Sequence, residues 1–106
     1  MDAVADAWAM FRAHLDARIR EINEEVAHYP TPIARCDEQL TKLLEQRARI
    51  FRQRNAAADL GPMPSGAATN AWLLRVGDYL TTLEPCADDD IETALRRRIV
   101  SSMSVR

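Results

Sequence analysis

The sequence predicts an all-α protein, in which a long antiparallel helical hairpin carries two shorter helices in an arrangement like a four-helix bundle. Two observations support this prediction. Large apolar residues recur every three or four positions in four separate segments, and proline and glycine residues gather between those segments. No segment of useful length alternates polar and apolar residues as a strand does. We expect a single helical domain over residues 1–106.

The segment 3–29 is predicted to form one long helix. On a helical wheel of about 100° per residue, its large apolar residues fall within about 40° of Leu15. Because this stripe is narrow and nearly follows a heptad repeat, it suits packing against one or two partner helices. The residues of the stripe are Val4, Trp8, Phe11, Leu15, Ile19, Ile22, Val26 and Tyr29.

A second long helix is predicted over residues 32–59. Pro30 ends the first helix, Thr31 can cap the second, and Pro32 fits the first helical position, where no backbone N–H is needed. Gly61 is available as a left-handed cap at the other end. Because the connection between the two long helices is short, we expect them to run antiparallel.

Residues 59–66 form the clearest linker, and two shorter helices are predicted after it, over residues 67–83 and 88–101. Gly77 lies in the middle of the first of these, where glycine costs about 1 kcal/mol relative to alanine. The expected buried residues are Trp72, Leu73, Val76, Tyr79, Leu80 and Leu83 in the first short helix, and Ile91, Leu95 and Ile99 in the second.

The charge and the composition argue against several classes of function. The net charge of −2 disfavours a nucleic-acid-binding domain, which needs a strongly basic surface. No apolar run approaches the roughly 20 residues that span a bilayer, and the acidic start lacks the basic region of a secretory signal. We therefore expect a cytoplasmic protein without membrane contact, in which Cys36 and Cys86 are reduced and unpaired.

Arg47 and Arg54 are the most informative polar residues, because they project into the apolar stripe of the second helix. An arginine in an apolar seam is costly unless it is paired or bound to an anion. We expect the stems of both side chains to cover the seam while their guanidinium groups pair with Asp16, with Glu25 or with a partner chain. The alternative is a small-molecule anion site inside the bundle.

Residues 33–47 read Ile-Ala-Arg-Cys-Asp-Glu-Gln-Leu-Thr-Lys-Leu-Leu-Glu-Gln-Arg. Through Asp37, the leucine pair and Arg47, this segment resembles the first helix of the all-helical chorismate mutases. The resemblance implies an enzyme in which Arg47 lies in the active site. It is confined to this segment, because the family's upstream arginine falls on Pro30 and its downstream lysine falls on Ala58.

Two arginine clusters are the remaining basic feature: Arg49 and Arg52 on the second helix, and residues 96–98 near the end of the fourth. Acidic residues interleave with the first cluster, and the second cluster complements its helix dipole together with the acidic residues 88–90. We expect the first cluster to lie on a solvent-exposed face that carries ion pairs, and the second to have this structural role at the helix end. A weak nucleic-acid binder is the alternative, and it requires the two clusters to converge on one face.

No arrangement for catalysis, for a cofactor or for a metal is expected. Glu21, Glu24, Glu25 and His28 share a polar face of the first helix, but no second cluster of ligands faces them in the expected hairpin. An exposed acidic turn is the simpler interpretation. With two histidines and two cysteines so placed, the sequence offers no pair of nucleophile and base.

The function that these observations favour is a small non-enzymatic helical module for protein–protein interaction or assembly. Two long helices expose more seam than two shorter helices cover, so the expected partner is a second copy, forming a homodimer, or another helical protein. The expected interface residues are Trp8, Phe11, Leu15 and Phe51, because aromatic residues dominate such contacts. A self-contained bundle with an internal seam is the structural alternative.

Overall fold

The computed structural model describes residues 2–29, 37–85 and 89–104. These residues form four α-helices and no strand, which confirms the all-α prediction: α1 (Ala3–Ala27), α2 (Asp37–Leu60), α3 (Ala68–Thr82) and α4 (Asp90–Ser104). The predicted start of the second helix at residue 32 and its cap at Thr31 lie outside the described residues, as do both cysteines, Cys36 and Cys86.

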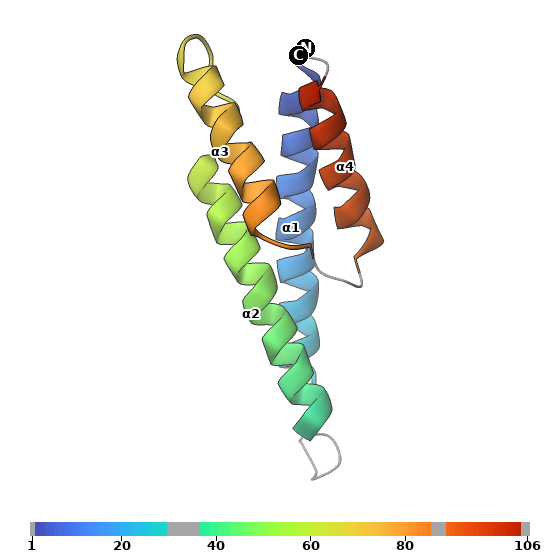
Figure 1. The fold of residues 1–106 in the computed structure, drawn as a ribbon. Helices are drawn as coiled ribbons and strands as arrows, with labels where there is room; N and C mark the ends of the chain where they lie inside the picture. Colours follow the sequence, from blue (N-terminus) through green and yellow to red (C-terminus); the bar gives the residue numbers. More distant parts are fainter. Residues whose placement is uncertain (1, 30–36, 86–88, 105–106) are drawn as a thin grey trace.

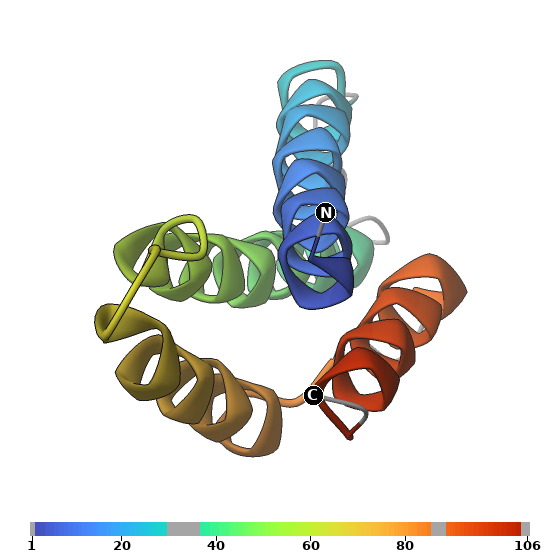
Figure 2. The same cartoon turned by 90° about the horizontal axis from the view of Figure 1, so that it is seen from above.

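The hairpin of α1 and α2 runs the length of the molecule, with the two helices antiparallel (Figure 1). α3 runs antiparallel to α2, and α4 runs antiparallel to α1. With 15 residues each, against 25 and 24 in the hairpin, α3 and α4 cover only the half that holds the start of α1. The molecule is therefore elongated, at 55 × 21 × 19 Å. Seen from above, the four helices of the bundle end surround a common core (Figure 2).

Local interactions define the helix ends near this core. Asp2 caps α1, because its carboxylate accepts hydrogen bonds from the backbone N–H groups of Val4 (2.9 Å) and Ala5 (3.3 Å). Gly61 has a φ of +67°, and its N–H donates to the Ala57 carbonyl at 3.2 Å. Gly61 is thus the left-handed cap of α2 that the sequence predicts.

Two tryptophans complete the cap of α2. The indole N–H of Trp8 donates to the Gly61 carbonyl (2.9 Å), and that of Trp72 donates to the Leu60 carbonyl (3.1 Å). The last carbonyls of a helix have no partner within the helix, so these bonds satisfy two acceptors while the rings bury apolar area. Both α1 and α3 are thereby fixed to the C-terminal end of α2.

The bundle core is built around four aromatic rings, whose centroids lie 5.5–5.9 Å apart in neighbouring pairs. Three of the four pairs are edge-to-face, an arrangement that aromatic rings favour. The rings belong to Trp8, Phe11, Trp72 and Tyr79, and the other buried residues of this cluster are Val4, Ala7, Leu15, Ala57, Val76 and Ile99.

The structure does not leave Trp8, Phe11 and Leu15 available as interface residues, contrary to the expectation from sequence. Each is at most 2% exposed within the single chain, because α3 and α4 cover this part of α1. The apolar stripe identified a buried face, but periodicity does not tell whether the covering surface belongs to the same chain. Of the four expected interface residues, Phe51 alone is partly exposed.

The buried face of α4 also differs from the predicted one. Ile91, expected in the apolar stripe, is 62% exposed, whereas Glu92 and Arg96 are 1% and 7% exposed. Ile99 is buried as expected, and Leu95 packs against the core. The charged pair can face inward because the two side chains form an ion pair at 3.2 Å. The sequence analysis assigned Arg96 only a role at the helix end and did not predict its burial.

The guanidinium group of Arg96 finds partners on three other helices as well. Its Nη2 donates to the side-chain oxygen of Gln53 (2.7 Å) on α2, and its Nη1 donates to the carbonyl of Leu83 (2.7 Å), which caps α3. It also lies over the Phe11 ring of α1, 5.5 Å from the centroid. This one side chain therefore joins all four helices.

Removing one partner of the buried pair should damage the fold more than removing both. Glu92→Gln leaves the Arg96 charge buried without its counter-charge, and we expect it to lower the free energy of unfolding by about 3 kcal/mol. The double variant Glu92→Gln/Arg96→Met removes the stranded charge and should recover part of this loss. Urea unfolding measures both values, and additive losses in the double variant would contradict the prediction.

Gly77 offers a stabilising substitution, because its place in α3 does not require glycine. A Cβ atom there would lie 3.7 Å from the Met103 methyl group, an ordinary van der Waals distance. We expect Gly77→Ala to raise the free energy of unfolding by about 0.5–1 kcal/mol, measured by thermal unfolding. Gly61→Ala is the control: it meets no atom, yet should destabilise the protein because its φ is +67°. A loss of stability in Gly77→Ala would show that α3 and α4 cannot accommodate one methyl group.

Candidate functional site

The half of the hairpin beyond α3 and α4 carries the candidate residues that remain accessible. We call residues 19–27 of α1 and 37–51 of α2 the stalk. The last contacts of the bundle lie just before it, where Asp89 meets Arg18 and where Gln53 meets the Glu84 carbonyl. Within the described chain, α1 and α2 of the stalk have only each other to pack against (Figure 1).

The core of the stalk is correspondingly small. Ile19, Ile22 and Ile50 are buried, and Leu43 and Phe51 pack against them while staying partly exposed. Two helices alone cannot enclose all the apolar side chains of their facing sides. The stalk therefore leaves part of its apolar surface to solvent.

α2 presents two strips of mostly apolar residues. They are offset from each other by one residue, or about 100° around the helix. The inner strip faces the rest of the chain, and the outer strip lies beside it with the 4-3-4-3 spacing of a heptad repeat. Leu44 of the outer strip is 43% exposed, and its other members are partly buried. The inner strip is Leu43, Ile50, Gln53 and Ala57, and the outer strip is Leu40, Leu44, Arg47, Phe51 and Arg54.

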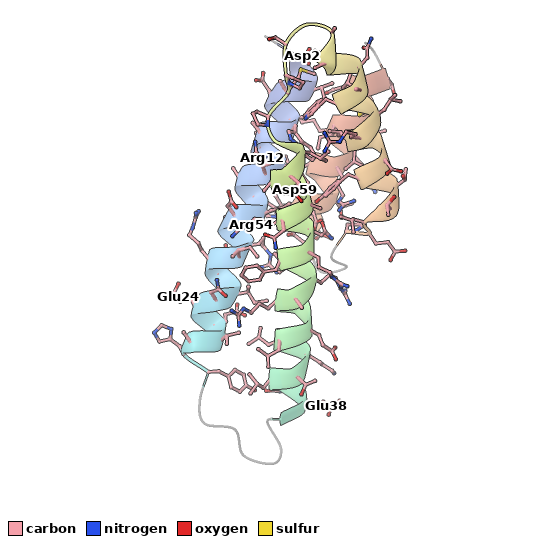
Figure 3. The ribbon with its side chains drawn as sticks, turned by 90° about the vertical axis from the view of Figure 1, so that its left-hand side faces the viewer. Asp2, Arg12, Glu24, Glu38, Arg54 and Asp59 are labelled. Atoms are coloured by element: carbon pink, nitrogen blue, oxygen red, sulfur yellow. The ribbon has the colours of Figure 1, made fainter. Side chains whose placement is uncertain are left out.

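Two hollows lie along the outer strip. The upper hollow, of about 140 Å³, lies between α1 and α2, and Arg12, Asp16 and Arg54 are among the residues that line it. The lower hollow, of about 460 Å³, is lined by Leu44, Arg47, Ala48 and Phe51. Figure 3 shows Arg12 and Arg54 on this side of the hairpin. We call the outer strip, together with Arg12 and Asp16 of α1, the open face.

Phe51 connects the two hollows, because both predicted arginines lie over its ring. The guanidinium carbon of Arg47 is 5.5 Å from the ring centroid, and that of Arg54 is 5.8 Å away. Such cation–π contacts hold a guanidinium group in place and contribute about 0.5–1 kcal/mol at exposed sites. The Phe51 ring therefore contacts the charged ends of both arginines.

The two arginines differ in their carboxylate partners. Arg54 Nε lies 3.6 Å from Asp16 Oδ1, an ion pair with one of the expected partners, but too long for a hydrogen bond. Arg47 has no carboxylate within ion-pair distance among the described residues, and neither has Arg12. Glu25, the other expected partner, lines a different hollow at the end of α1. The open face therefore has three arginines and one carboxylate, which leaves it with an excess of positive charge.

The lower hollow does not form the kind of site that the mutase resemblance implies. Such a site needs Arg47 inside an enclosed pocket with further cationic groups. In the described structure this hollow is open, and the other residues that line it are Leu44, Ala48 and Phe51. The geometry instead gives Arg47 an aromatic neighbour and an apolar surround.

The arginine clusters do not converge on one face, as a nucleic-acid interface would require. Arg49 and Arg52 line a hollow where α2 meets the end of α3. Arg96 points into the bundle, and Arg98 lies against the Met10 sulfur of α1 at 3.2 Å. The acidic side chains of α1 line a shallow hollow at the end of that helix, and among the described residues no three His, Cys, Asp or Glu side chains are placed to hold a metal ion.

One polar cluster was missed by the sequence analysis, at the start of α4. Asp89 caps this helix, because its Oδ1 accepts the backbone N–H of Glu92 at 2.9 Å. Its Oδ2 lies 2.6 Å from His14 Nε2 and 3.4 Å from Arg18 Nε, so it also joins α4 to α1. An aspartate three residues before a glutamate is a known start signal for helices, and it could have identified Asp89. These contacts give the cluster a structural role, because they attach the start of α4 to α1.

The comparisons with known proteins leave this geometry as the guide to function. No protein-family model matches the chain, and neither a curated protein nor a solved structure matches it. Among the described helices, none combines the length and the apolarity that a membrane span requires.

Stability should fall at acid pH because of Asp89. Burial alone would raise the pKa of Asp89, but the Glu92 N–H, His14 and Arg18 outweigh it and hold this pKa below its usual 3.8. The carboxylate therefore stabilises the fold fully at neutral pH, and this contribution is lost as the pH falls through 3.8 and the lowered pKa. We expect Asp89→Asn to cost about 1 kcal/mol at pH 7 and to flatten the acid limb of a plot of unfolding free energy against pH.

The control for this prediction is Asp16→Asn. Asp16 is more than half exposed and belongs to a single ion pair, so its removal should leave the acid limb nearly unchanged. Urea unfolding at a series of pH values gives both curves. An Asp89→Asn protein with the acid limb of the unaltered protein would contradict the assignment.

Proposed function

We propose that this protein is a helical interaction module, and that its open face binds an α-helix of a partner chain. The observation that carries the proposal is the outer strip of α2, a second seam with heptad spacing, in which Leu44 is 43% exposed and the other members are partly buried. From Leu40 to Phe51 the strip lies on the stalk, where the described chain offers no third helix. A helix laid along the strip would meet Leu40, Leu44 and Phe51 at the spacing of coiled-coil contacts.

The shape of the open face supports a helical partner over a small ligand. The lower hollow is shallow, and its apolar residues, Leu44, Ala48 and Phe51, come from two successive turns of one helix. Such a surface receives one side chain of a partner helix between its own side chains, as a knob enters a hole. A small molecule needs a pocket that encloses most of its surface.

The remaining exposed apolar side chains are scattered, unlike those of the outer strip. Met10, Leu74, Ile91 and Val100 are each about half exposed or more, but they lie on three different helices. Single exposed apolar residues are normal on a protein surface. The outer strip differs because its residues are adjacent and follow one period.

Two occupants fit this proposal, namely a second copy of the chain, as in the homodimer expected from the sequence, and a helix of another protein. In either case the interface residues would be Leu40, Leu44 and Phe51, and the last of these is retained from the sequence analysis. We also propose a cytoplasmic location, supported by a content of two cysteines, which is too low for a disulfide framework.

A photo-cross-linking amino acid in place of Leu44 tests the proposal in cells that express the protein naturally. We expect one discrete covalent adduct, because position 44 would lie against the partner helix. The same amino acid in place of Leu74, which is 77% exposed on α3, should give no such adduct. An adduct at twice the 12.0 kDa chain mass would identify a second copy.

Two further outcomes decide the proposal. Addition of Phe51→Asp should remove the adduct at position 44, because it places a charge in the centre of the strip. The absence of any adduct at position 44, or the same pattern of adducts from positions 44 and 74, would contradict the proposed interface.

A further inference from the structure

Resting on the proposed function, we infer that the natural occupant of the open face is an acidic helix of another protein, and not a second copy of this chain. The helix would carry two carboxylates seven residues apart, on either side of an apolar residue that packs against Phe51. The inference comes from the charges of the open face and from the order in which they alternate with apolar residues.

The open face carries a positive local charge. The two hollows are lined by three guanidinium groups, of Arg12, Arg47 and Arg54, and by one carboxylate, of Asp16. The chain as a whole has a net charge of −2, so this positive surface runs against the overall balance. Glu24 and Glu38, labelled in Figure 3, line neither hollow. A surface of one sign favours a partner of the other sign.

Arg47 and Arg54 already contact an aromatic ring within the single chain. The guanidinium carbons of Arg47 and Arg54 lie 5.5 and 5.8 Å from the centroid of the Phe51 ring, and these contacts favour their positions before any partner arrives. A guanidinium group carries five N–H donors, so beside an aromatic ring it can still bind a carboxylate through two parallel hydrogen bonds. The one carboxylate near Arg54, that of Asp16, lies 3.6 Å from the buried Nε atom and makes no hydrogen bond with it, so the charge of Arg54 is only weakly paired within the chain.

A second copy of this chain does not complement the open face. In a symmetric dimer the same patch lies on both sides of the interface. Two open faces would then bring together twice the three arginines against twice the single Asp16. Like charges placed opposite one another cost stability at an interface. The acidic hollow near the end of α1 does not substitute for a partner, because its lining, Glu21, Glu24, Glu25 and His28, offers no large apolar residue to meet Phe51.

The charged and apolar residues of the outer strip alternate in a regular order. Along the outer strip, two leucines are followed by Arg47, Phe51 and Arg54, so the two charges lie seven residues apart, or about 10.5 Å along the helix. A partner helix packed alongside has the same rise per residue. Its carboxylates would therefore also lie seven residues apart, with an apolar residue three or four positions from each.

Synthetic helical peptides of 21 residues provide the test. All share one apolar heptad seam; one has glutamate at the two positions that would face Arg47 and Arg54, and another has lysine there. Fluorescence anisotropy with the whole protein should show the glutamate peptide binding at least about tenfold more tightly at low salt, with a smaller difference at high salt. The Arg47→Glu/Arg54→Glu variant should reverse the order of the two peptides.

The control variants separate this inference from the proposed function. Leu44→Asp should abolish binding of both peptides, whereas Leu74→Asp should leave binding unchanged, and circular dichroism verifies that every variant is folded. Equal binding of the two peptides, lost in Leu44→Asp, would overturn the acidic partner and keep the helix-binding module. Binding of neither peptide overturns the acidic partner, and the cross-link at position 44 then decides the module by itself. Light scattering that finds a dimer dissociated by Leu44→Asp would assign the open face to a second copy.

Discussion

The buried guanidinium group of Arg96 is the interaction on which the bundle end depends. It lies over Phe11 of α1, bonds Gln53 of α2 and the cap of α3, and pairs with Glu92 on its own helix. Apolar contacts alone would let short helices slide along a long hairpin, because one apolar residue replaces another at small cost. A buried charge tolerates few positions, since each N–H that loses its acceptor carries the full cost of desolvation. Arg96 thus fixes where α3 and α4 sit.

That position determines which surface is left for a partner. Because α3 and α4 are held at the end where Trp8 and Trp72 cap α2, their 15 residues do not reach the stalk. The bundle end is thus held by a polar network, whereas the small core of the stalk, Ile19, Ile22 and Ile50, is packed by α1 and α2 alone. A partner would therefore add most to the packing along the stalk.

The sequence predicts the parts of this structure that depend on local rules. The helices follow from periodicity, and the cap at Gly61 follows from the need for a positive φ. The inward face of α4 could not be predicted, because Glu92 and Arg96 count as surface residues until their partners on other helices are known. Similarly, the wide apolar stripe of α2 gave the positions of Arg47 and Arg54, but only packing divides it into an inner and an outer strip.

Arginine serves three different purposes along the molecule, and the change from one to the next follows the loss of covering helices. Arg96, surrounded by four helices, has partners within the chain at each of its three guanidinium nitrogens. Arg54, at the border of the stalk, has one distant carboxylate and one ring. Arg47, within the stalk, has the Phe51 ring and no ion pair among the described residues. As helices are lost, the acceptors that an arginine needs must increasingly come from outside the chain, so the stalk is where a partner gains most from binding.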